Sequence, residues 1–136
     1  MADQRRPRGL LDTSVIIDLE RLDPADLPIE SAISAITMAE LAAGPQATQD
    51  PNERARRQDR LQRAEAAFDP LPFDSEASRA YGRVYAAVVA GGRKARGARA
   101  VDLLLAATAC SVGLPLYTRN PDDFRALNDL VEVVSV

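Results

Sequence analysis

An apolar run that stops at a single carboxylate constrains this chain more than any other stretch. Residues 9–11 are uncharged, Asp12 follows, and apolar residues with helical spacing begin at Val15. This order predicts a short buried strand over 8–12, a tight turn, and a helix over 14–21. Asp12 then lies at the carboxyl end of a strand, where open parallel sheets place their ligand sites. A carboxylate in apolar surroundings is costly unless it is hydrogen-bonded, paired or bound to a cation, so Asp12 needs a partner.

The remainder of the chain alternates between strand-like and helical segments. Strands separated by helices indicate an α/β fold with a central parallel sheet and helices on both faces. With 136 residues, of which 46% are hydrophobic, the chain has the size and apolar content of a single domain over 1–136, preceded by a polar lead at 1–7. The predicted strands are 8–12, 33–36, 114–118 and 130–134, and the predicted helices are 14–21, 37–43, 53–68, 74–90 and 101–112.

Composition excludes several classes of function. The chain has no histidine, which removes Ser-His-Asp and Cys-His catalysis and histidine-bound zinc. Cys110 is the only cysteine, so no intrachain disulfide forms; we expect it to be a small buried hydrophobe in a cytoplasmic protein. No signal peptide and no membrane-spanning run are visible. A net charge of -3 argues against a protein that coats nucleic acid, but it permits a local basic patch.

Three acids stand alone in otherwise uncharged segments. Asp12, Glu40 and Asp102 are each the only charged residue in a long apolar stretch, whereas the chain elsewhere is densely charged. Each falls near a predicted strand end or the first turn of a predicted helix, and right-handed crossovers bring the carboxyl ends of the strands to one edge of the sheet. Asp122 and Asp123 follow a predicted strand and can reach the same edge. The pattern therefore predicts one shared acidic site.

Grouped carboxylates repel one another, and some take up protons unless a cation neutralises them. Ligands that offer only oxygen favour a hard divalent cation, Mg²⁺ or Mn²⁺. Such an ion lowers the pKa of bound water and stabilises a phosphoryl transition state. The acids therefore predict metal-dependent hydrolysis of a phosphodiester.

Each acid also has a purely structural interpretation. Asp12 could be a helix N-cap. Glu40 could complete a capping box with Thr37. Asp102, in the first turn of its predicted helix, could complement the helix dipole, and the two later aspartates could be turn residues. These interpretations do not exclude a metal site, because a capped and oriented carboxylate remains a good ligand.

Four motifs occur in order along the chain: Leu11-Asp12-Thr13-Ser14, Ala39-Glu40-Leu41, Asp102 to Ala109, and Thr118 to Phe124. Together they resemble the successive motifs of PIN-domain ribonucleases, and within these the VapC-type toxins of bacterial toxin–antitoxin pairs. The resemblance covers about residues 9–134. It implies a three-layer PIN-like α/β fold, Mg²⁺- or Mn²⁺-dependent endoribonuclease activity on RNA, and a homodimer. It also implies a cognate VapB-type antitoxin that blocks the site and through which the toxin meets DNA only indirectly.

The resemblance also implies a quartet of catalytic, metal-binding acids. Asp12 and Asp102 bind the metal most directly, and Glu40 either completes the shell or takes a proton from the attacking water. The fourth ligand comes from the last motif, where Asn120, Asp122 and Asp123 are the alternatives; we favour Asp123, holding a metal-bound water. The polar side chains expected to orient ligands or bound water are Ser14, Thr118 and Asn120.

Two groups of basic residues have open roles. The segment before Asp102 either contacts RNA phosphates or is a solvated loop; its cations are Arg93, Lys94, Arg96 and Arg99. The predicted helix over 53–68 presents either a solvated basic face or partners for an acidic antitoxin segment; its arginines are Arg54, Arg56, Arg57, Arg60 and Arg63.

Two other classes of function stay open. An aspartyl-phosphate phosphatase of the haloacid-dehalogenase type also begins with an aspartate after a strand, but it needs a second acid two positions on, where this chain has Ser14. A non-catalytic module could keep the fold and act in a DNA-bound repressor complex with its partner. Covalent trapping at Asp12 would support the first alternative, and an intact metal site without RNA cleavage would support the second.

Overall fold

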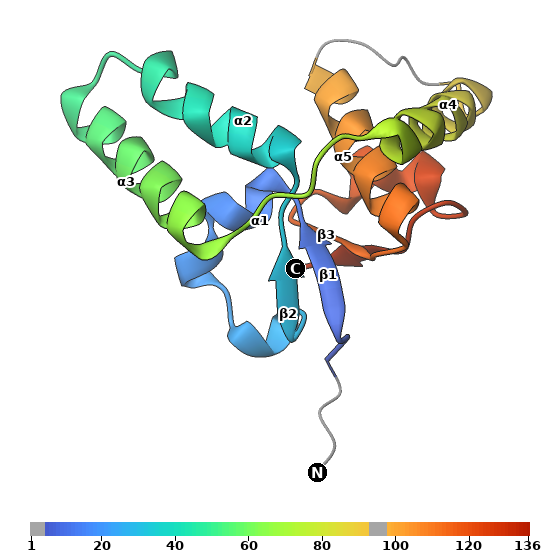
Figure 1. Ribbon diagram of the computed structural model, residues 1–136, viewed down its shortest axis with the longest axis horizontal. Coiled ribbons are helices and arrows are strands. Elements are labelled where there is room, and N and C mark those ends of the chain that lie inside the picture. The colour runs from blue at the N-terminus through green and yellow to red at the C-terminus, as the bar shows by residue number, and fades with distance from the viewer. Residues whose placement is uncertain (1–4, 93–97) are drawn as a thin grey trace.

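A sheet of parallel strands forms the centre of the computed structural model, which describes residues 5–92 and 98–136 apart from the side chains at 98 and 99 (Figure 1). The strand order is β2-β1-β3-β4. All pairings are parallel, with Leu10 of β1 opposite Ala32 on one side and Leu116 on the other. The carboxyl ends of the strands therefore meet at one edge, as predicted. The strands are β1 (Arg8–Leu11), β2 (Glu30–Ala32), β3 (Leu116–Thr118) and β4 (Val133–Ser135).

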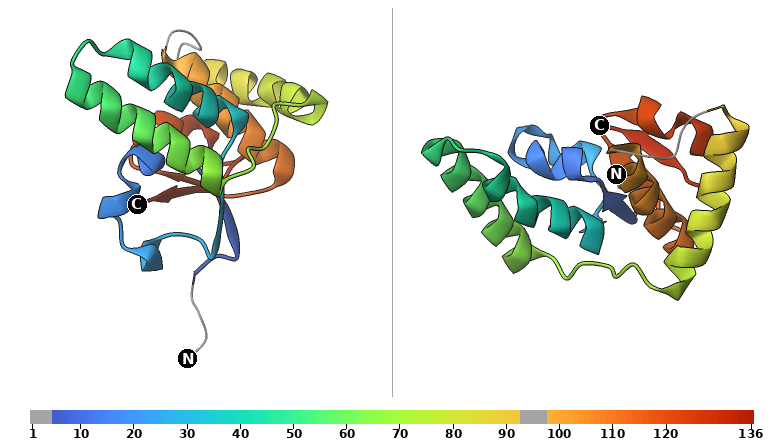
Figure 2. Two further views of the ribbon diagram at one scale, coloured as in Figure 1. Left: turned by 60° about the vertical axis from the view of Figure 1, so that its left-hand side comes forward. Right: turned by 90° about the horizontal axis from the view of Figure 1, so that it is seen from above.

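Helices flank this sheet in two pairs. In Figure 1 the hairpin of α2 and α3 forms one arm and the pair α4 and α5 forms the other, and the view from above in Figure 2 places the strands between them. The helices are α1 (Thr13–Ile17), α2 (Ala35–Ala43), α3 (Pro51–Ala67), α4 (Ser75–Ala90) and α5 (Ala98–Val112). Short 3-10 turns lie in the connections between the helices and strands: η1 (Leu19–Arg21), η2 (Pro24–Asp26), η3 (Gly44–Ala47) and η4 (Pro121–Leu127).

Both faces of the sheet are buried, because successive strand residues point to opposite sides. Leu10 and Leu116 belong to a core shared with α4, α5 and η4, whereas Leu11 and Tyr117 belong to a second core shared with α1, α2 and α3. These four side chains are all nearly inaccessible to solvent. The alternation of neighbouring residues between two cores confirms the three-layer α/β architecture.

Side-chain caps and one glycine set the ends of the longer helices. Asp50 caps α3 by accepting from the Asn52 amide, and Asp74 caps α4 by accepting from the Ala77 amide. Gly113, with a φ of 68°, follows the end of α5, a conformation that favours glycine. These boundaries lie within three residues of the predicted ones because each depends on a local side-chain or backbone requirement.

Several predicted boundaries were wrong. The second strand is Glu30–Ala32 rather than 33–36, because Ser34 caps α2 and Ile36 already lies in that helix. The predicted helix over 14–21 divides into α1 and η1, and the last strand is shifted towards the carboxyl terminus, to Val133–Ser135.

Cys110 is half-buried rather than fully buried, at the margin of the core beneath α4.

Within the described parts of the chain, none of the helices combines the length and the apolar character needed to cross a bilayer.

Candidate active site

Asp12 occupies the turn between β1 and α1 and is only 5% exposed. Its Oδ1 atom accepts from the Ser14 amide at 2.8 Å, the Val15 amide at 3.3 Å and the Ser14 hydroxyl. The N-cap interpretation of Asp12 is therefore confirmed. All these bonds converge on one oxygen, and Oδ2 accepts no hydrogen bond from the described residues. The carboxylate is fixed through Oδ1 and can offer Oδ2 to a ligand.

Ser14 ties the Asp12 turn to the turn that follows β3. Its hydroxyl donates to Asp12 and accepts from the Arg119 amide at 3.1 Å. The Asp12 amide donates to the Tyr117 carbonyl at 2.9 Å, which holds the two turns together from the other side. The segments around Asp12 and Thr118, more than a hundred positions apart in the chain, thus meet at the carboxyl edge of the sheet.

The last motif forms a compact turn beyond β3. Thr118 is buried, and its hydroxyl accepts from the Asn120 amide at 3.0 Å, so this side chain shapes the turn. The Asp123 amide in turn donates to the Asn120 carbonyl at 3.1 Å. Asn120 and Asp122 are exposed and Asp123 is half-buried; both aspartates have an interaction partner within the chain.

Glu40 is connected to the Asp12 turn through Thr13. The Thr13 hydroxyl lies 2.5 Å from Glu40 Oε1 and 3.1 Å from the hydroxyl of Thr37, which is fully buried. The expected capping box of Thr37 and Glu40 is wrong, because Ser34 is the N-cap and its hydroxyl accepts from the Thr37 amide at 3.0 Å. Glu40 lies too far into α2 to cap it, and its carboxylate meets α1 instead.

The sequence did not predict the contacts of Thr13 with Thr37 and Glu40. Thr13 lies inside the first motif, so its hydroxyl was visible as a candidate. Which acid it contacts depends on the packing of α1 against α2, however, and no local spacing encodes that packing.

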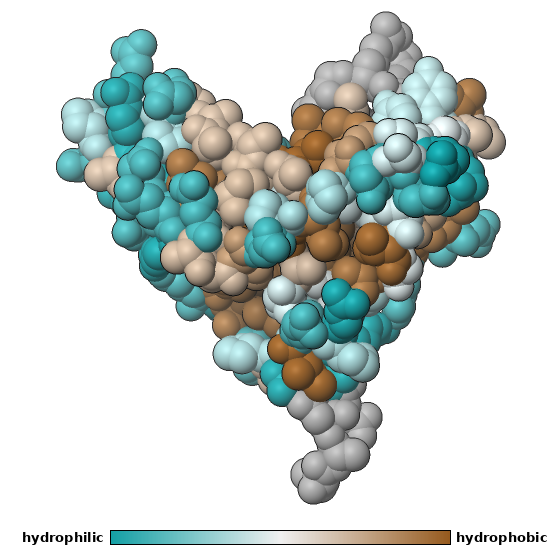
Figure 3. Space-filling model, viewed as in Figure 1, coloured by the Kyte–Doolittle hydropathy of each residue, from teal (hydrophilic) through white to brown (hydrophobic). Residues whose placement is uncertain are grey.

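Asp102 lies on α5 and is half-buried. The helix spans Ala98–Val112, so Asp102 lies one turn inside it, and its expected position in the first turn is wrong. Asp102 has an interaction partner within the chain. Because α5 contacts both α2 and η4, it flanks the elements that carry Glu40 and Asp123. Figure 3 shows a notch between the arm of α2 and α3 and the arm of α4 and α5, at the edge to which the strands point.

The four predicted acids are not gathered into a ready ligand cluster. Over residues 5–92 and 98–136, no group of three or more acidic, histidine or cysteine side chains lies close enough to hold a metal ion. The chemistry of the donors nevertheless fits a hard divalent cation. Asp12 and Glu40 each accept hydrogen bonds through one carboxylate oxygen, which leaves the other for an oxygen-preferring ion.

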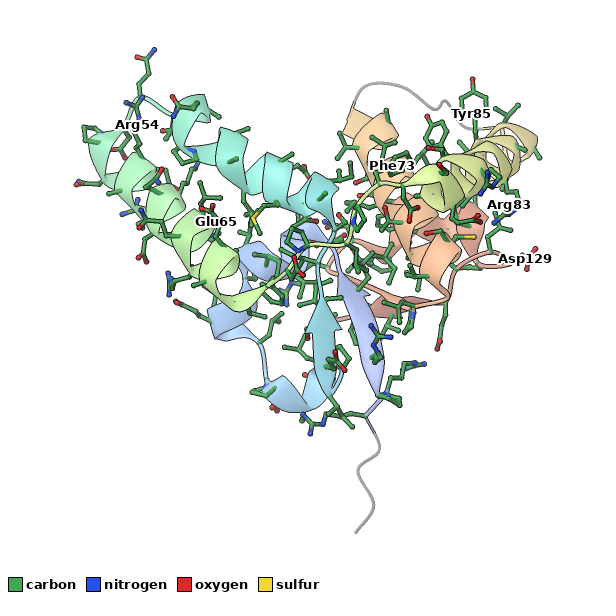
Figure 4. All side chains as sticks on the ribbon, viewed as in Figure 1. Arg54, Glu65, Phe73, Arg83, Tyr85 and Asp129 are labelled. Carbon is green, nitrogen blue, oxygen red and sulfur yellow. The ribbon has the colours of Figure 1, made fainter. Side chains whose placement is uncertain are left out.

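The structure describes only one of the two predicted groups of basic residues, the arginines of α3. Arg93, Lys94 and Arg96 lie outside the described residues, as does the side chain of Arg99. On α3, Arg54 donates to the carbonyls of Pro45 and Thr48 and stands at the outer end of its arm in Figure 4. Three more arginines of this helix form ion pairs within the chain: Arg56 and Arg57 with Glu53, and Arg63 with Glu20 and Asp59.

Comparison with known families and sequences gives one consistent result. The family model described as PIN domain matches residues 9–130. Ribonuclease VapC5 of Mycobacterium tuberculosis is 38% identical over 133 residues, which cover 94% of this chain and 95% of that protein. Ribonuclease VapC of Rickettsia bellii is 34% identical over 132 residues, covering 93% and 95% of the two chains.

Solved structures show the same similarity. VapBC-5 from Mycobacterium tuberculosis, a member of the VapBC family of toxin–antitoxin systems, contains a chain that matches with a TM-score of 0.84 and 37% identity, covering 96% of this chain and 99% of that one. VapBC2 from Rickettsia felis, bound to a DNA fragment from its promoter, matches with a TM-score of 0.76 over 95% and 98% of the chains. Its 20% identity supports the fold alone.

Proposed function

We propose, on the premise that this chain belongs to the PIN-domain family and within it to the VapC-type ribonucleases, that it is an endoribonuclease and the toxin of a toxin–antitoxin pair. The observation that carries this proposal is the Asp12 turn. It holds a carboxylate by one oxygen at the carboxyl edge of the sheet and connects to the motifs of Glu40 and Thr118 through the hydroxyls of Thr13 and Ser14.

PIN-domain ribonucleases in general depend on a divalent metal ion, and we propose Mg²⁺ or Mn²⁺ for this chain. A bound ion would activate water and neutralise charge on the phosphoryl group. Asp12 would bind it through Oδ2 while Ser14 fixes Oδ1. Asp102 and Asp123 would supply further oxygens from the flanking elements. Glu40, held through Oε1 by Thr13, would either bind the ion or accept a proton from the attacking water through Oε2.

The partners follow from the same family. The solved VapBC structures pair a toxin with an antitoxin, and some of them are bound to DNA. We therefore propose a VapB-type antitoxin as the partner of this chain, with DNA contacted through the antitoxin rather than by the toxin itself. We also propose that this chain forms a homodimer and is located in the cytoplasm.

The test uses purified protein free of antitoxin and a total RNA pool. Wild-type protein cleaves RNA with Mg²⁺ or Mn²⁺, and EDTA stops the cleavage. Asp12→Asn and Asp102→Asn each abolish cleavage, because a neutral amide is a poor ligand for a hard cation. Asp129→Asn is the matched control: Asp129 is an exposed aspartate on the opposite side of the molecule from α2 (Figure 4), and its substitution leaves cleavage unchanged.

Three outcomes separate this proposal from its alternatives. Full activity of Asp12→Asn refutes the metal assignment. Formation of a covalent phosphoryl adduct on Asp12 assigns the protein to the aspartyl-phosphate phosphatases. Metal binding by the wild-type protein without cleavage of any RNA assigns it to the non-catalytic modules.

A further inference from the structure

A pocket of about 330 Å³ opens beside Glu40, between α1, α2 and α3. Thr13 and Glu40 line it from the side of the acidic site, and Arg57 and Arg60 line it from α3. The predicted acids and the arginines of α3 therefore share one cavity.

The donors of Arg57 are occupied by neighbours within the chain. Its Nε donates to Glu53 Oε1 at 3.1 Å and its Nη1 donates to the Gly44 carbonyl at 2.9 Å. Hydrogen bonds from Arg56 first, and from Arg57, lower the pKa of Glu53, so this carboxylate stays charged at neutral pH. Arg57 thus fixes α3 against the end of α2, and two of its donor nitrogens are already used within the chain.

Arg60 differs from the arginines around it. It is half-buried in the pocket wall, and no residue in the described parts of the chain forms a hydrogen bond or an ion pair with it. Its neighbour one turn further along α3, Arg63, is by contrast paired with Asp59 at 2.8 Å and with Glu20. A partly buried guanidinium that forms no ion pair has donors available for an anion that enters the pocket.

RNA is the anion that the surroundings favour. A strand that approaches Asp12 and Glu40 brings phosphates towards like charges, which costs free energy unless cations stand nearby. The planar guanidinium group binds a phosphate through two parallel hydrogen bonds. We propose that Arg60 binds a backbone phosphate of the RNA strand that flanks the scissile position, with the pocket beside Glu40 as its subsite. This proposal rests on the proposed ribonuclease function.

An acidic protein segment is the competing occupant. Arg60 also lines a second pocket of about 190 Å³ together with Ile16, Ile17 and Phe68. The pocket shared with Glu40 favours RNA, because it places Arg60 in the same cavity as an acid of the proposed catalytic site. The experiment therefore includes a poly-glutamate arm.

The experiment measures binding of a fluorescein-labelled single-stranded RNA by anisotropy over a range of salt concentrations, in an Asp12→Asn background that does not cut the RNA. Arg60→Gln is compared with Arg63→Gln, which removes the same charge from the same helix away from the Glu40 pocket. We expect Arg60→Gln to weaken binding about tenfold at low salt and to lower the slope of log K against log salt by about 0.7, the value for one lost phosphate contact on a single strand. Arg60→Lys, which keeps the charge, retains the slope.

The outcomes are distinct. An unchanged RNA affinity and slope in Arg60→Gln overturns the proposal, as does an equal effect of Arg63→Gln. Loss of poly-glutamate binding without a change in RNA binding also overturns it and assigns Arg60 to an acidic protein partner. If wild-type protein cuts no RNA although Arg60→Gln shows the expected slope change, the ribonuclease function fails and the phosphate subsite stands.

Discussion

Thr13→Val tests how Glu40 is held in position. Valine has nearly the shape of threonine but lacks the hydroxyl that lies 2.5 Å from Glu40 Oε1 and 3.1 Å from Thr37 Oγ1. Because a threonine hydroxyl has a single proton, Thr13 donates to the carboxylate and accepts from Thr37. The substitution therefore removes one hydrogen bond to a charged group and one to a buried hydroxyl.

The two lost hydrogen bonds have different consequences. Thr37 is fully buried, so its hydroxyl loses its acceptor in a place that water does not easily reach, which costs about 1–3 kcal/mol of folding free energy. Glu40 is exposed, and water replaces the bond that its carboxylate loses. Its orientation is no longer fixed, however, and losing an outer partner of a metal ligand costs about 10–100-fold in metal affinity or activity.

Two measurements separate these effects. Urea unfolding in EDTA gives the folding free energy without metal, and electron paramagnetic resonance of free Mn²⁺ gives the metal affinity of the folded protein. Thr13→Ser keeps the hydroxyl and restores most of both quantities. The double variant Thr13→Val/Thr37→Val is less destabilised than the sum of the single variants, because removing both members of a buried pair leaves no unsatisfied group. Wild-type Mn²⁺ affinity in Thr13→Val would refute the positioning role of Thr13.

Two further predictions concern residues that support the site. Ser14→Ala removes the hydroxyl that joins Asp12 to the Arg119 amide, and we expect RNA cleavage to fall about 10–100-fold in a protein that still unfolds cooperatively. Gly9→Ala places a methyl group 2.4 Å from the buried ring of Tyr117, and we expect a loss of about 1–3 kcal/mol, read as a lower urea midpoint at unchanged slope. Gly82→Ala, on an open helix face, is the control and gains about 0.5–1 kcal/mol; equal behaviour of the two glycine variants would contradict the packing argument.

Features that depend on neighbouring residues were predictable from the sequence. The first strand ends where its apolar run ends, and Asp12 caps the next helix because aspartate after a strand can accept from amides two and three positions on. Asp74 and Gly113 mark helix ends by the same local chemistry. The parallel sheet followed from the alternation of strands and helices.

Features that depend on distant packing were not predictable in the same way. Residues 33–36 have the composition of a strand, yet Ile33 and Ala35 exchange backbone hydrogen bonds with Leu71, from the segment between α3 and α4, at 2.9 and 2.8 Å. The bridge lies outside the main sheet and leaves Ser34 free to cap α2. The contact between Thr13 and Glu40 likewise requires α1 and α2 to pack together, which no spacing within either motif specifies.

The two interpretations of Asp12, helix cap and metal ligand, use different oxygens and are therefore compatible. Oδ1 accepts the capping bonds, and Oδ2 accepts none from the described residues. Asparagine is as good an N-cap as aspartate, so Asp12→Asn keeps the helix start and removes only the charge. Asp12→Ala removes both and loses about 1 kcal/mol of stability. If both variants lose RNA cleavage while only Asp12→Ala loses stability, the inactivity comes from the missing charge; an equal loss of stability in Asp12→Asn would show that the two roles cannot be separated.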